Sequence, residues 1–247
     1  MGDAGNSHPM RAVIMAGGEG TRLRPFTRNI PKPLLPVGRR PVGQIIVERL
    51  RDLGFDHATL TLEYNAELLK AFFQDGAQFG LAIDYYHEPR KMGTAGCLAH
   101  VPGLRGAGPF LVTNGDVLTD LDYAAMLAGH AASGAAMTVA TRRGAVAIPY
   151  GVLKLDNAGT IASVDEKPTL DYVFNAGVYA LGDEALAFVP DAPDAPPLPM
   201  TDLIQALVAA GRTVRAHPVE GLWFDLARVD DFEAANAELE RVKPEWL

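Results

Sequence analysis

Five short apolar runs in the first half of the chain have the length and composition of buried strands: residues 12–15, 58–62, 81–86, 110–113 and 137–141. Between them, apolar residues recur every three or four positions, which predicts helices at residues 44–53, 66–74 and 123–132 and a further helix that begins near Thr94. Gly54 follows the first of these helices, where a glycine commonly ends a helix. This alternation of strands and helices predicts a doubly wound, mainly parallel sheet of the α/β class.

From Gly151 onward the pattern changes to shorter β segments, at residues 151–155, 161–165 and 173–180. The run Asn157-Ala158-Gly159 is rich in turn-forming residues, so it predicts a hairpin between the first two segments. The proline-rich stretch 190–199 is interpreted as a surface connector, and helices are expected at residues 201–210 and 230–241. We therefore expect one α/β domain, residues 11–247, with a smaller β-rich part.

Composition narrows the class of protein. The chain has 247 residues, of which 48% are hydrophobic and 21% are charged, as in an ordinary globular protein that buries a substantial core. Its net charge of −8 argues against binding to nucleic acid or to a membrane surface, and no apolar run approaches the length of a transmembrane helix. Residues 1–10 are small and polar, which predicts a disordered tail. Cys97 is the only cysteine, which excludes an intramolecular disulfide and favours a cytoplasmic location.

Residues 16–36, AGGEGTRLRPFTRNIPKPLLP, carry the most informative motif. Gly17, Gly18 and Gly20 follow the first strand, and glycines allow a tight turn whose N–H groups approach a ligand closely. Successive N–H groups in such a turn form a cradle for an anion. Arg22 and Lys32 would add positive charge, so the motif predicts a loop that binds phosphate groups.

The surrounding charge supports this prediction. Between Arg11 and Arg40 there are seven arginines and lysines and one acidic residue, Glu19, although the chain as a whole is acidic. A local excess of positive charge concentrates anions. The spacing excludes a P-loop, and it excludes the dinucleotide fingerprint because Leu23 stands where a third glycine is needed.

The pattern GGxGTRLxPxTxxxPKPxxP resembles the signature of the sugar-1-phosphate nucleotidyltransferases, including members similar to mannose-1-phosphate guanylyltransferase. Weaker correspondences continue to about Asn236. The resemblance implies a Rossmann-like, GT-A-like fold with a nucleotide-binding half at residues 11–141 and a sugar-phosphate-binding half at residues 142–247. It also implies that Arg22 and Lys32 neutralise the phosphates during transfer, and that the triphosphate is wrapped by the glycine loop, namely Ala16, Gly17, Gly18, Gly20 and Thr21.

Asp116 ends the apolar strand in PFLVTNGD, and ligands of open α/β sheets collect at the carboxyl ends of strands. A carboxylate that faces a triphosphate needs a cation between them, and Mg²⁺ is commonly held by one or two carboxylates, phosphate oxygens and water. The alternative is that Asp116 caps the following turn. The resemblance implies a metal-binding role for Asp116 and for Asp225 in GLWFDLARVDD. The family's Trp-x-Asp-Ile-Gly pattern is altered in this chain, because Ala227 replaces the glycine.

A third motif is Asp165-Glu166-Lys167-Pro168, followed by Asn175-Ala176-Gly177. The resemblance implies that Glu166 binds sugar hydroxyls and that Lys167 binds the phosphate of the sugar and aligns it for attack. It also implies sugar contacts at Asn114, Gly151 and Asn175. Taken without the resemblance, the Glu-Lys-Pro segment is more simply a solvated turn.

The segment HEPRKMGTAGCL is expected to choose the base, with Gly93 and Thr94 close to the nucleotide. Glu88 lies five residues before Gly93 and resembles the acidic residue of guanylyltransferase-like members. A carboxylate can accept hydrogen bonds from both N1–H and N2–H of guanine, whereas uracil and thymine offer one donor. GTP is therefore favoured over UTP and CTP. The alternative for Glu88 is an exposed residue before a turn.

The expected reaction is an in-line attack of a sugar 1-phosphate oxygen on the α-phosphorus of the NTP, with release of pyrophosphate. Because the attacking oxygen is already anionic, charge neutralisation and positioning replace a general base. Two other interpretations remain. One is a glycosyltransferase that uses Asp120-Leu121-Asp122 as an Asp-x-Asp metal motif, and the other is an inactive nucleotide-sugar sensor. A homodimer is plausible for the family, and the sugar is not identified.

Overall fold

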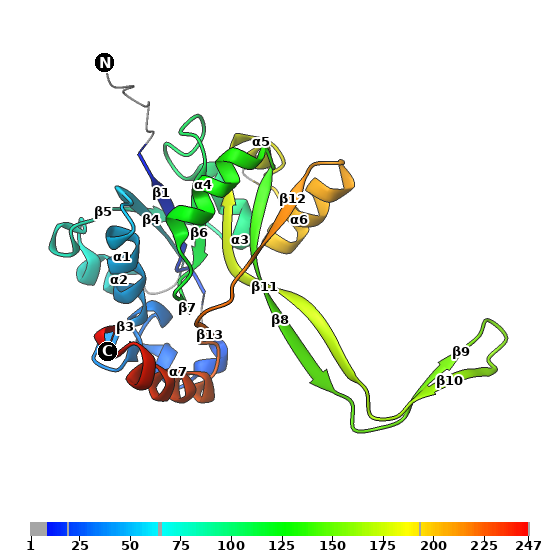
Figure 1. Cartoon of the computed structure of the whole chain (residues 1–247). Coiled ribbons are helices and arrows are strands. Elements are labelled where there is room, and N and C mark those ends of the chain that lie inside the picture. The colour runs from blue at the N-terminus through cyan, green and yellow to red at the C-terminus, as the bar shows by residue number, and fades with distance from the viewer. Residues whose placement is uncertain (1–8, 19, 64–65, 193, 247) are drawn as a thin grey trace, which may run out of the picture.

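The computed structural model describes residues 9–18, 20–63, 66–192 and 194–246, and the tail expected at residues 1–10 therefore lies mostly outside the described residues. The central sheet has seven strands in the order β12-β8-β11-β6-β1-β4-β5 (Figure 1). Four of its six strand pairings are parallel, and the two pairings of β11 are antiparallel. The bounds are β1 (Arg11–Met15), β4 (His57–Leu62), β5 (Ala82–His87), β6 (Phe110–Asn114), β8 (Met137–Ala147), β11 (Thr169–Leu181) and β12 (Val214–Pro218).

Helices cover both faces of the sheet, which confirms the predicted doubly wound α/β fold. The alternation along β1 illustrates the reason, since Ala12 and Ile14 pack in one buried apolar cluster and Val13 packs in the other. One cluster includes residues of α1 (Val42–Asp52), α2 (Ala66–Phe73), α4 (Tyr123–Ser133) and α7 (Val229–Val242). The other includes residues of α3 (Gly93–Gly96), α5 (Asp183–Leu186) and α6 (Met200–Ala209).

Short elements connect this framework. The 3₁₀ helices are η1 (Thr21–Leu23), η2 (Phe26–Arg28), η3 (Lys32–Leu34), η4 (Ala77–Phe79), η5 (Cys97–His100) and η6 (Pro244–Trp246). Two small antiparallel strand pairs were not predicted from the sequence: β2 (Pro36–Val37) with β3 (Arg40–Pro41), and β7 (Val117–Thr119) with β13 (Trp223–Asp225). Strand β12 and helix α5 were also not predicted. Among the described helices, none is both long and apolar enough to cross a lipid bilayer.

The predicted hairpin between β9 (Val152–Leu155) and β10 (Ile161–Asp165) is present. The flanking strands are longer than expected, because β8 continues to Ala147 and β11 begins at Thr169. Their paired extensions carry the hairpin away from the rest of the molecule (Figure 1). We call residues 142–174 the arm and the rest of the molecule the body.

Candidate active site

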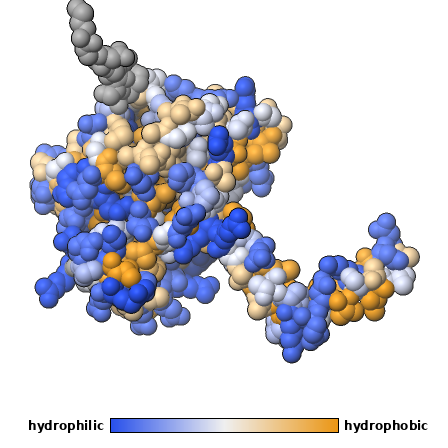
Figure 2. All heavy atoms as spheres, viewed as in Figure 1, coloured by the Kyte–Doolittle hydropathy of each residue, from blue (hydrophilic) through white to orange (hydrophobic). Residues whose placement is uncertain are grey.

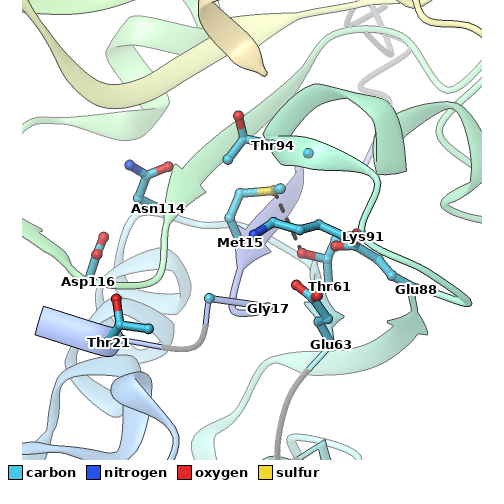
Figure 3. A pocket seen from close by; sticks show the side chains of 13 residues that line it. Met15, Gly17, Thr21, Thr61, Glu63, Glu88, Lys91, Thr94, Asn114 and Asp116 are labelled. Carbon is cyan, nitrogen blue, oxygen red and sulfur yellow. Dashed lines mark hydrogen bonds between the residues drawn. The ribbon is translucent and has the colours of Figure 1, made fainter. Parts of the chain in front are cut away.

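A cleft of about 400 Å³ opens at the carboxyl ends of β1, β4 and β6 (Figure 3). This is where ligands of open α/β sheets are expected. Nine of the residues proposed from the sequence line it: Gly17, Gly18, Gly20, Thr21, Glu88, Gly93, Thr94, Asn114 and Asp116. Four further lining residues, Met15, Thr61, Glu63 and Lys91, were not proposed from the sequence.

The glycine loop has a shape that requires glycine at Gly20. Its φ of +58° lies in the left-handed region, and a Cβ there would come 2.7 Å from Cγ2 of Thr27. The Thr27 hydroxyl donates a hydrogen bond of 2.7 Å to the carbonyl of Gly20, which holds the two residues together. A Cβ on Gly18 would meet no described atom within 4 Å, so this part of the loop leaves room for a ligand.

Asp116 stands two residues after the end of β6 and lies at one end of the cleft, near Thr21 (Figure 3). The N–H of Gly115 donates to the carbonyl of Met15 at 3.0 Å, which fixes the end of β6 beside the end of β1. The ammonium of Lys32 forms an ion pair with Oδ2 of Asp116. Lys32, Asp116 and Ala16 also line a small adjoining cavity of about 40 Å³.

The β7–β13 pair brings Asp225 to the same end of the site. Asp225 stands opposite Val117, and the N–H of Leu226 donates to the carbonyl of Asp116 at 3.0 Å. The pKa of Asp225 is raised, chiefly because burial removes water from its carboxylate. The negative charge of Asp116 raises the pKa further, and the positive charge of Lys32 lowers it in part. The carboxylates of Asp116 and Asp225 and the ammonium group of Lys32 therefore lie together at this end of the site.

This donor set fits a hard divalent cation. Carboxylate oxygens are ligands that Mg²⁺ prefers, and the repulsion between Asp116 and Asp225 is what a cation between them would relieve. Within the described parts of the chain, no group of three or more His, Cys, Asp or Glu side chains is arranged to hold a metal. Phosphate oxygens and water would have to supply the remaining ligands, as is usual for Mg²⁺.

Acidic residues also lie at the opposite end of the cleft, where Glu63, Glu88, Lys91 and Thr61 are grouped (Figure 3). Glu88 is buried, with 7% of its surface exposed, so the alternative of an exposed residue is wrong. Its Oε2 accepts a hydrogen bond of 3.0 Å from the N–H of Met92. Burial raises the pKa of Glu88, and this hydrogen bond opposes the shift.

Gly93 and Thr94 are held by the end of the proline-rich stretch and by the start of α6. Gly93 has φ of +78°, and a Cβ there would come 2.6 Å from the carbonyl oxygen of Leu198. The hydroxyl of Thr94 accepts a hydrogen bond of 2.8 Å from the N–H of Met200. The close backbone approach at Gly93 is therefore made to Leu198, while the residue still borders the cleft.

Thr61 and Glu63, which were not proposed from the sequence, could have been predicted from it. They stand at and just after the end of the predicted strand 58–62, the same position relative to a strand that singled out Asp116. The hydroxyl of Thr61 donates to Sδ of Met15 at 3.7 Å, which is the contact drawn in Figure 3.

Asn175 lies beside the Asp225 end of the site. It lines a cavity of about 90 Å³ together with Asn114, Trp223 and Asp225. Its Nδ2 donates to the hydroxyl of Tyr179 at 2.7 Å, and its Oδ1 accepts from the N–H of Gly177 at 2.9 Å. Asn114 and Asn175, two of the residues proposed for the sugar phosphate, are therefore brought together.

Arg22 lies in a neighbouring cleft of about 400 Å³, which it shares with Asp225, Trp223 and Arg228. The positive charge of Arg22 lowers the pKa of Asp225 slightly against the larger effects that raise it. Ala227, which replaces the family glycine, lines this second cleft. Arg22 is thus close to the paired carboxylates.

Three proposed residues line none of these clefts and cavities. Gly151, Glu166 and Lys167 are exposed and belong to the arm, which extends away from the body (Figure 1). Gly151 and Glu166 are neighbours, since a Cβ on Gly151 would come 3.0 Å from Oε2 of Glu166. Lys167 has φ of +44°, an uncommon conformation for a residue with a side chain.

Comparisons with known proteins identify the family to which the chain is similar. Residues 11–242 match the sequence model of a family described as nucleotidyl transferase. The chain is 31% identical over 240 residues to the UTP--glucose-1-phosphate uridylyltransferase of Synechocystis sp., covering 90% of this chain and 61% of that protein. It is 30% identical over 239 residues to the mannose-1-phosphate guanylyltransferase of Mycobacterium tuberculosis, covering 95% of this chain and 66% of that protein.

The chain therefore spans somewhat less than two thirds of the length of these relatives. Among solved structures, a Bacillus anthracis protein in complex with sucrose superimposes with a TM-score of 0.76 at 24% identity, covering 95% of this chain and 96% of that one. HddC from Yersinia pseudotuberculosis superimposes with a TM-score of 0.71 at 24% identity, covering 93% of this chain and 99% of that one. These two likenesses show the fold.

Proposed function

The chain belongs to the nucleotidyl transferase family, and from this membership we propose that it transfers the nucleotidyl group of an NTP to a sugar 1-phosphate, giving an NDP-sugar and pyrophosphate. The observation that carries the proposal is the arrangement at one end of the cleft. There the glycine loop lies beside Lys32, Asp116 and Asp225, which come from three distant parts of the chain.

In this proposal the N–H groups of the glycine loop bind the triphosphate, and Arg22 and Lys32 neutralise its charge. Asp116 and Asp225 would hold a divalent cation, for which we propose Mg²⁺. When bound, the cation would neutralise phosphate charge in the transition state. Lys32, which pairs with Asp116 in the free protein, would then be released to contact a phosphate oxygen.

For the base we propose guanine. The buried carboxylate of Glu88, at the end of the cleft opposite Asp116, can accept the two adjacent N–H donors of that base. Several similar proteins are named mannose-1-phosphate guanylyltransferases, including one from Dictyostelium discoideum that is 33% identical over 230 residues. A second candidate is UTP, which the name of the Synechocystis relative favours.

For the sugar phosphate we propose the region that contains Asn114 and Asn175, completed by Gly151, Glu166 and Lys167. We keep the division into a nucleotide half, residues 11–141, and a sugar half, residues 142–247, as a proposal. It assigns β13 and Asp225 to the second half, although β13 pairs with β7 of the first half and Asp225 lies close to Asp116. Because Cys97 is the only cysteine and is a free thiol, which suits a reducing compartment, we propose a cytoplasmic location.

The glycosyltransferase interpretation is less well supported. Asp122 of the Asp-x-Asp motif caps α4, since its Oδ1 accepts a hydrogen bond of 2.8 Å from the N–H of Ala125. The inactive-sensor interpretation predicts the loss of charged site residues. Arg22, Lys32, Asp116 and Asp225 are all present.

The test is a pyrophosphate-release assay of the purified chain with four NTPs, a panel of hexose and heptose 1-phosphates, and Mg²⁺ or EDTA. We expect release that needs both substrates and the cation, with GTP the best NTP. Consumption of a nucleotide sugar with no pyrophosphate would support a glycosyltransferase. Binding of a nucleotide sugar with no turnover for any combination would support a sensor.

A further inference from the structure

The arm exposes an unusual amount of apolar surface. Of the fourteen large hydrophobic side chains that are exposed in the described chain, nine lie on the arm. Figure 2 shows hydrophobic residues along this segment, well separated from the body. The nine have exposed fractions from 49% to 73%: Val146, Tyr150, Leu153, Leu155, Ile161, Val164, Leu170, Tyr172 and Val173.

On the hairpin, the apolar side chains gather on one face. Leu153 pairs with Val164 and Leu155 pairs with Ile161, and residues two apart on a strand share a face. The opposite face carries Val152 and Ser163 together with the ion pair of 2.7 Å between Lys154 and Asp165. The hairpin is therefore amphipathic, although no part of the described body covers its apolar face (Figure 1). A two-stranded hairpin of this kind is marginally stable in water unless its face is covered.

The apolar face continues toward the active site. Val146 pairs directly with Leu170, and Tyr172 and Phe174 follow on the same face of β11. The rings of Tyr172 and Phe174 are 6.0 Å apart, and the ring of Phe174 lies 5.2 Å from that of Trp223, which borders the cavity at Asp225. An apolar stripe thus leads along the arm to the site.

The size of this surface matches a protein interface. Nine large side chains that are each about half exposed present on the order of 1,000 Å² in total over both faces of the arm, since Tyr172 and Val173 face opposite sides of β11. The largest single patch of a typical monomer has roughly 300–600 Å². A standard interface buries about 800 Å² on each partner. The arm is therefore large enough to hold two chains together.

The site itself is incomplete in one chain. Glu166 and Lys167 lie in the segment that joins β10 to β11, which Figure 1 shows out on the arm, whereas Asn175 and Asp225 border the cleft. Folding the arm back onto its own body would disturb the ladder between β8 and β11. That ladder pairs seven consecutive residues without a break, from Thr141 with Asn175 to Ala147 with Thr169. A second chain can be reached with the ladder intact.

We propose that the arm of one chain packs across a second copy of the same chain, which covers the apolar hairpin face and receives Glu166 and Lys167 at its sugar-phosphate site. The exchange is reciprocal, so a two-fold dimer has two complete sites, each with Asp116 and Asp225 from one chain and Lys167 from the other. The assignment of Lys167 to the sugar phosphate rests on the proposed function, whereas the dimer rests on the apolar surface of the arm.

The first test is the mass of the full chain in solution, measured by light scattering after size-exclusion chromatography at micromolar concentration. We expect a dimer. Leu155→Asp should raise the dimer Kd by more than about tenfold, since it places a charge on the covered face. Val208→Asp is the matched control, because Val208 on α6 is 59% exposed and Leu155 is 60% exposed. A monomeric wild type, or a Leu155→Asp variant that stays as dimeric as the control, overturns the proposal. Circular dichroism verifies that both variants are folded.

The second test mixes two inactive variants, Asp116→Asn and Lys167→Ala, under conditions that let subunits exchange. If sites are shared between chains, one site of each mixed dimer has both wild-type residues, and pyrophosphate release returns to about a quarter of the wild-type value. If each chain builds its own site, activity stays at the mean of the two variants, and the proposal is overturned even if the protein is a dimer. A wild type that releases no pyrophosphate would instead refute the proposed function, and the mass measurement would still decide the dimer.

Discussion

The ammonium of Lys32 pairs with the carboxylate of Asp116, eighty-four positions away in the sequence. Both side chains are largely shielded from water, with 13% and 24% of their surface exposed. Asp225 lies beside the pair and has a raised pKa, partly because of the charge of Asp116. In the free protein, Lys32 thus supplies the positive charge that holds two carboxylates together.

The first prediction concerns that charge. In Lys32→Met the two carboxylates lose the ammonium group that offsets their charge, so Tm without divalent cations should fall by about 3–6 °C. Adding Mg²⁺ should raise Tm more in the variant than in the wild type. We expect kcat for pyrophosphate release to fall at least about 10²-fold, as for loss of a group that stabilises transition-state charge. Lys70→Met, which removes a surface lysine paired with Glu67, is the control and should change neither value. Equal Mg²⁺ responses in wild type and variant would contradict the proposed site.

The second prediction is that the charged carboxylate of Asp225, although needed for turnover, lowers the stability of the folded protein at neutral pH. Its folded-state pKa is raised, so the folded protein binds more protons than the unfolded chain between the ordinary value of 3.8 and the raised one. Stability therefore falls as pH rises through that window. Asp225→Asn removes this loss and should raise Tm by about 2 °C at pH 7 without divalent cations, with no gain below about pH 4.

The same variant should lose Mg²⁺-dependent turnover. Glu240→Gln on the exposed face of α7 is the matched control and should leave both Tm and turnover unchanged. A drop in Tm for Asp225→Asn at pH 7 would show that the carboxylate stabilises the free protein, contrary to the destabilisation that its raised pKa implies.

The parts of the candidate site that could be predicted from the sequence are those whose position follows from a neighbouring strand. The glycine loop follows a strand whose burial can be read from its apolar run, and Asp116 stands shortly after the end of another such strand. Both positions follow from the rule that ligands collect at the carboxyl ends of strands. The same rule, applied to the strand that ends at Leu62, would have pointed to Glu63.

Prediction from the sequence failed where the structure depends on contacts between distant segments. Asp225 was placed with Asp116 only through the family resemblance, because the strands that bring them together, β7 and β13, have three residues each and are too short to show a period. The length of the arm was missed because residues 142–147, RRGAVA, lack the pattern of a buried strand. That segment is exposed and pairs only with β11 among the described strands, so its sequence carries no trace of burial on a core face.

The third prediction concerns the base. Glu88→Gln keeps the shape of the side chain but replaces an acceptor pair by one acceptor and one donor. The NH₂ group would oppose N1–H and N2–H of guanine and could donate to a carbonyl of uracil. We expect kcat/KM for GTP to fall by about 10²-fold or more and the ratio of GTP to UTP use to fall with it. Lys91→Gln, at the same end of the cleft, serves as a control for general disturbance. Equal losses for all four NTPs would remove the role of Glu88 in base choice.

The fourth prediction follows from the raised pKa of Glu88. Because the pKa is raised, the carboxylate takes up a proton at a higher pH than an ordinary glutamate, and the protonated form accepts guanine donors poorly. As the pH is lowered, KM for GTP should therefore begin to rise before the pH reaches the ordinary glutamate value of 4.5, while KM for UTP with the same sugar phosphate changes less. The ratio of the two cancels the titration of the sugar phosphate itself. This pH dependence of the ratio should be absent in Glu88→Gln, which has no titrating group at that position.

The last prediction concerns the shape of the phosphate-binding loop. Gly20→Ala puts a Cβ 2.7 Å from Cγ2 of Thr27 at a residue whose φ is +58°, so it combines backbone strain with a steric clash. Gly134→Ala is a matched control, since Gly134 has φ of +65° and a Cβ there would meet no described atom within 4 Å. We expect the control to lose about 1 kcal/mol of unfolding free energy and Gly20→Ala to lose about 2–4 kcal/mol, measured by urea denaturation.

Thr27→Ser separates the two causes. It removes Cγ2 but keeps the hydroxyl that donates to the carbonyl of Gly20 at 2.7 Å. In the double variant, Gly20→Ala with Thr27→Ser, the steric part should be recovered and the strain should remain, so stability should approach that of the Gly134→Ala control. Nucleotide affinity, measured by calorimetry, should recover in parallel if the loop shape sets the positions of the N–H groups that bind phosphate. Recovery of stability without recovery of affinity would show that Gly20 is needed for the fold of the loop and not for its contact with the nucleotide.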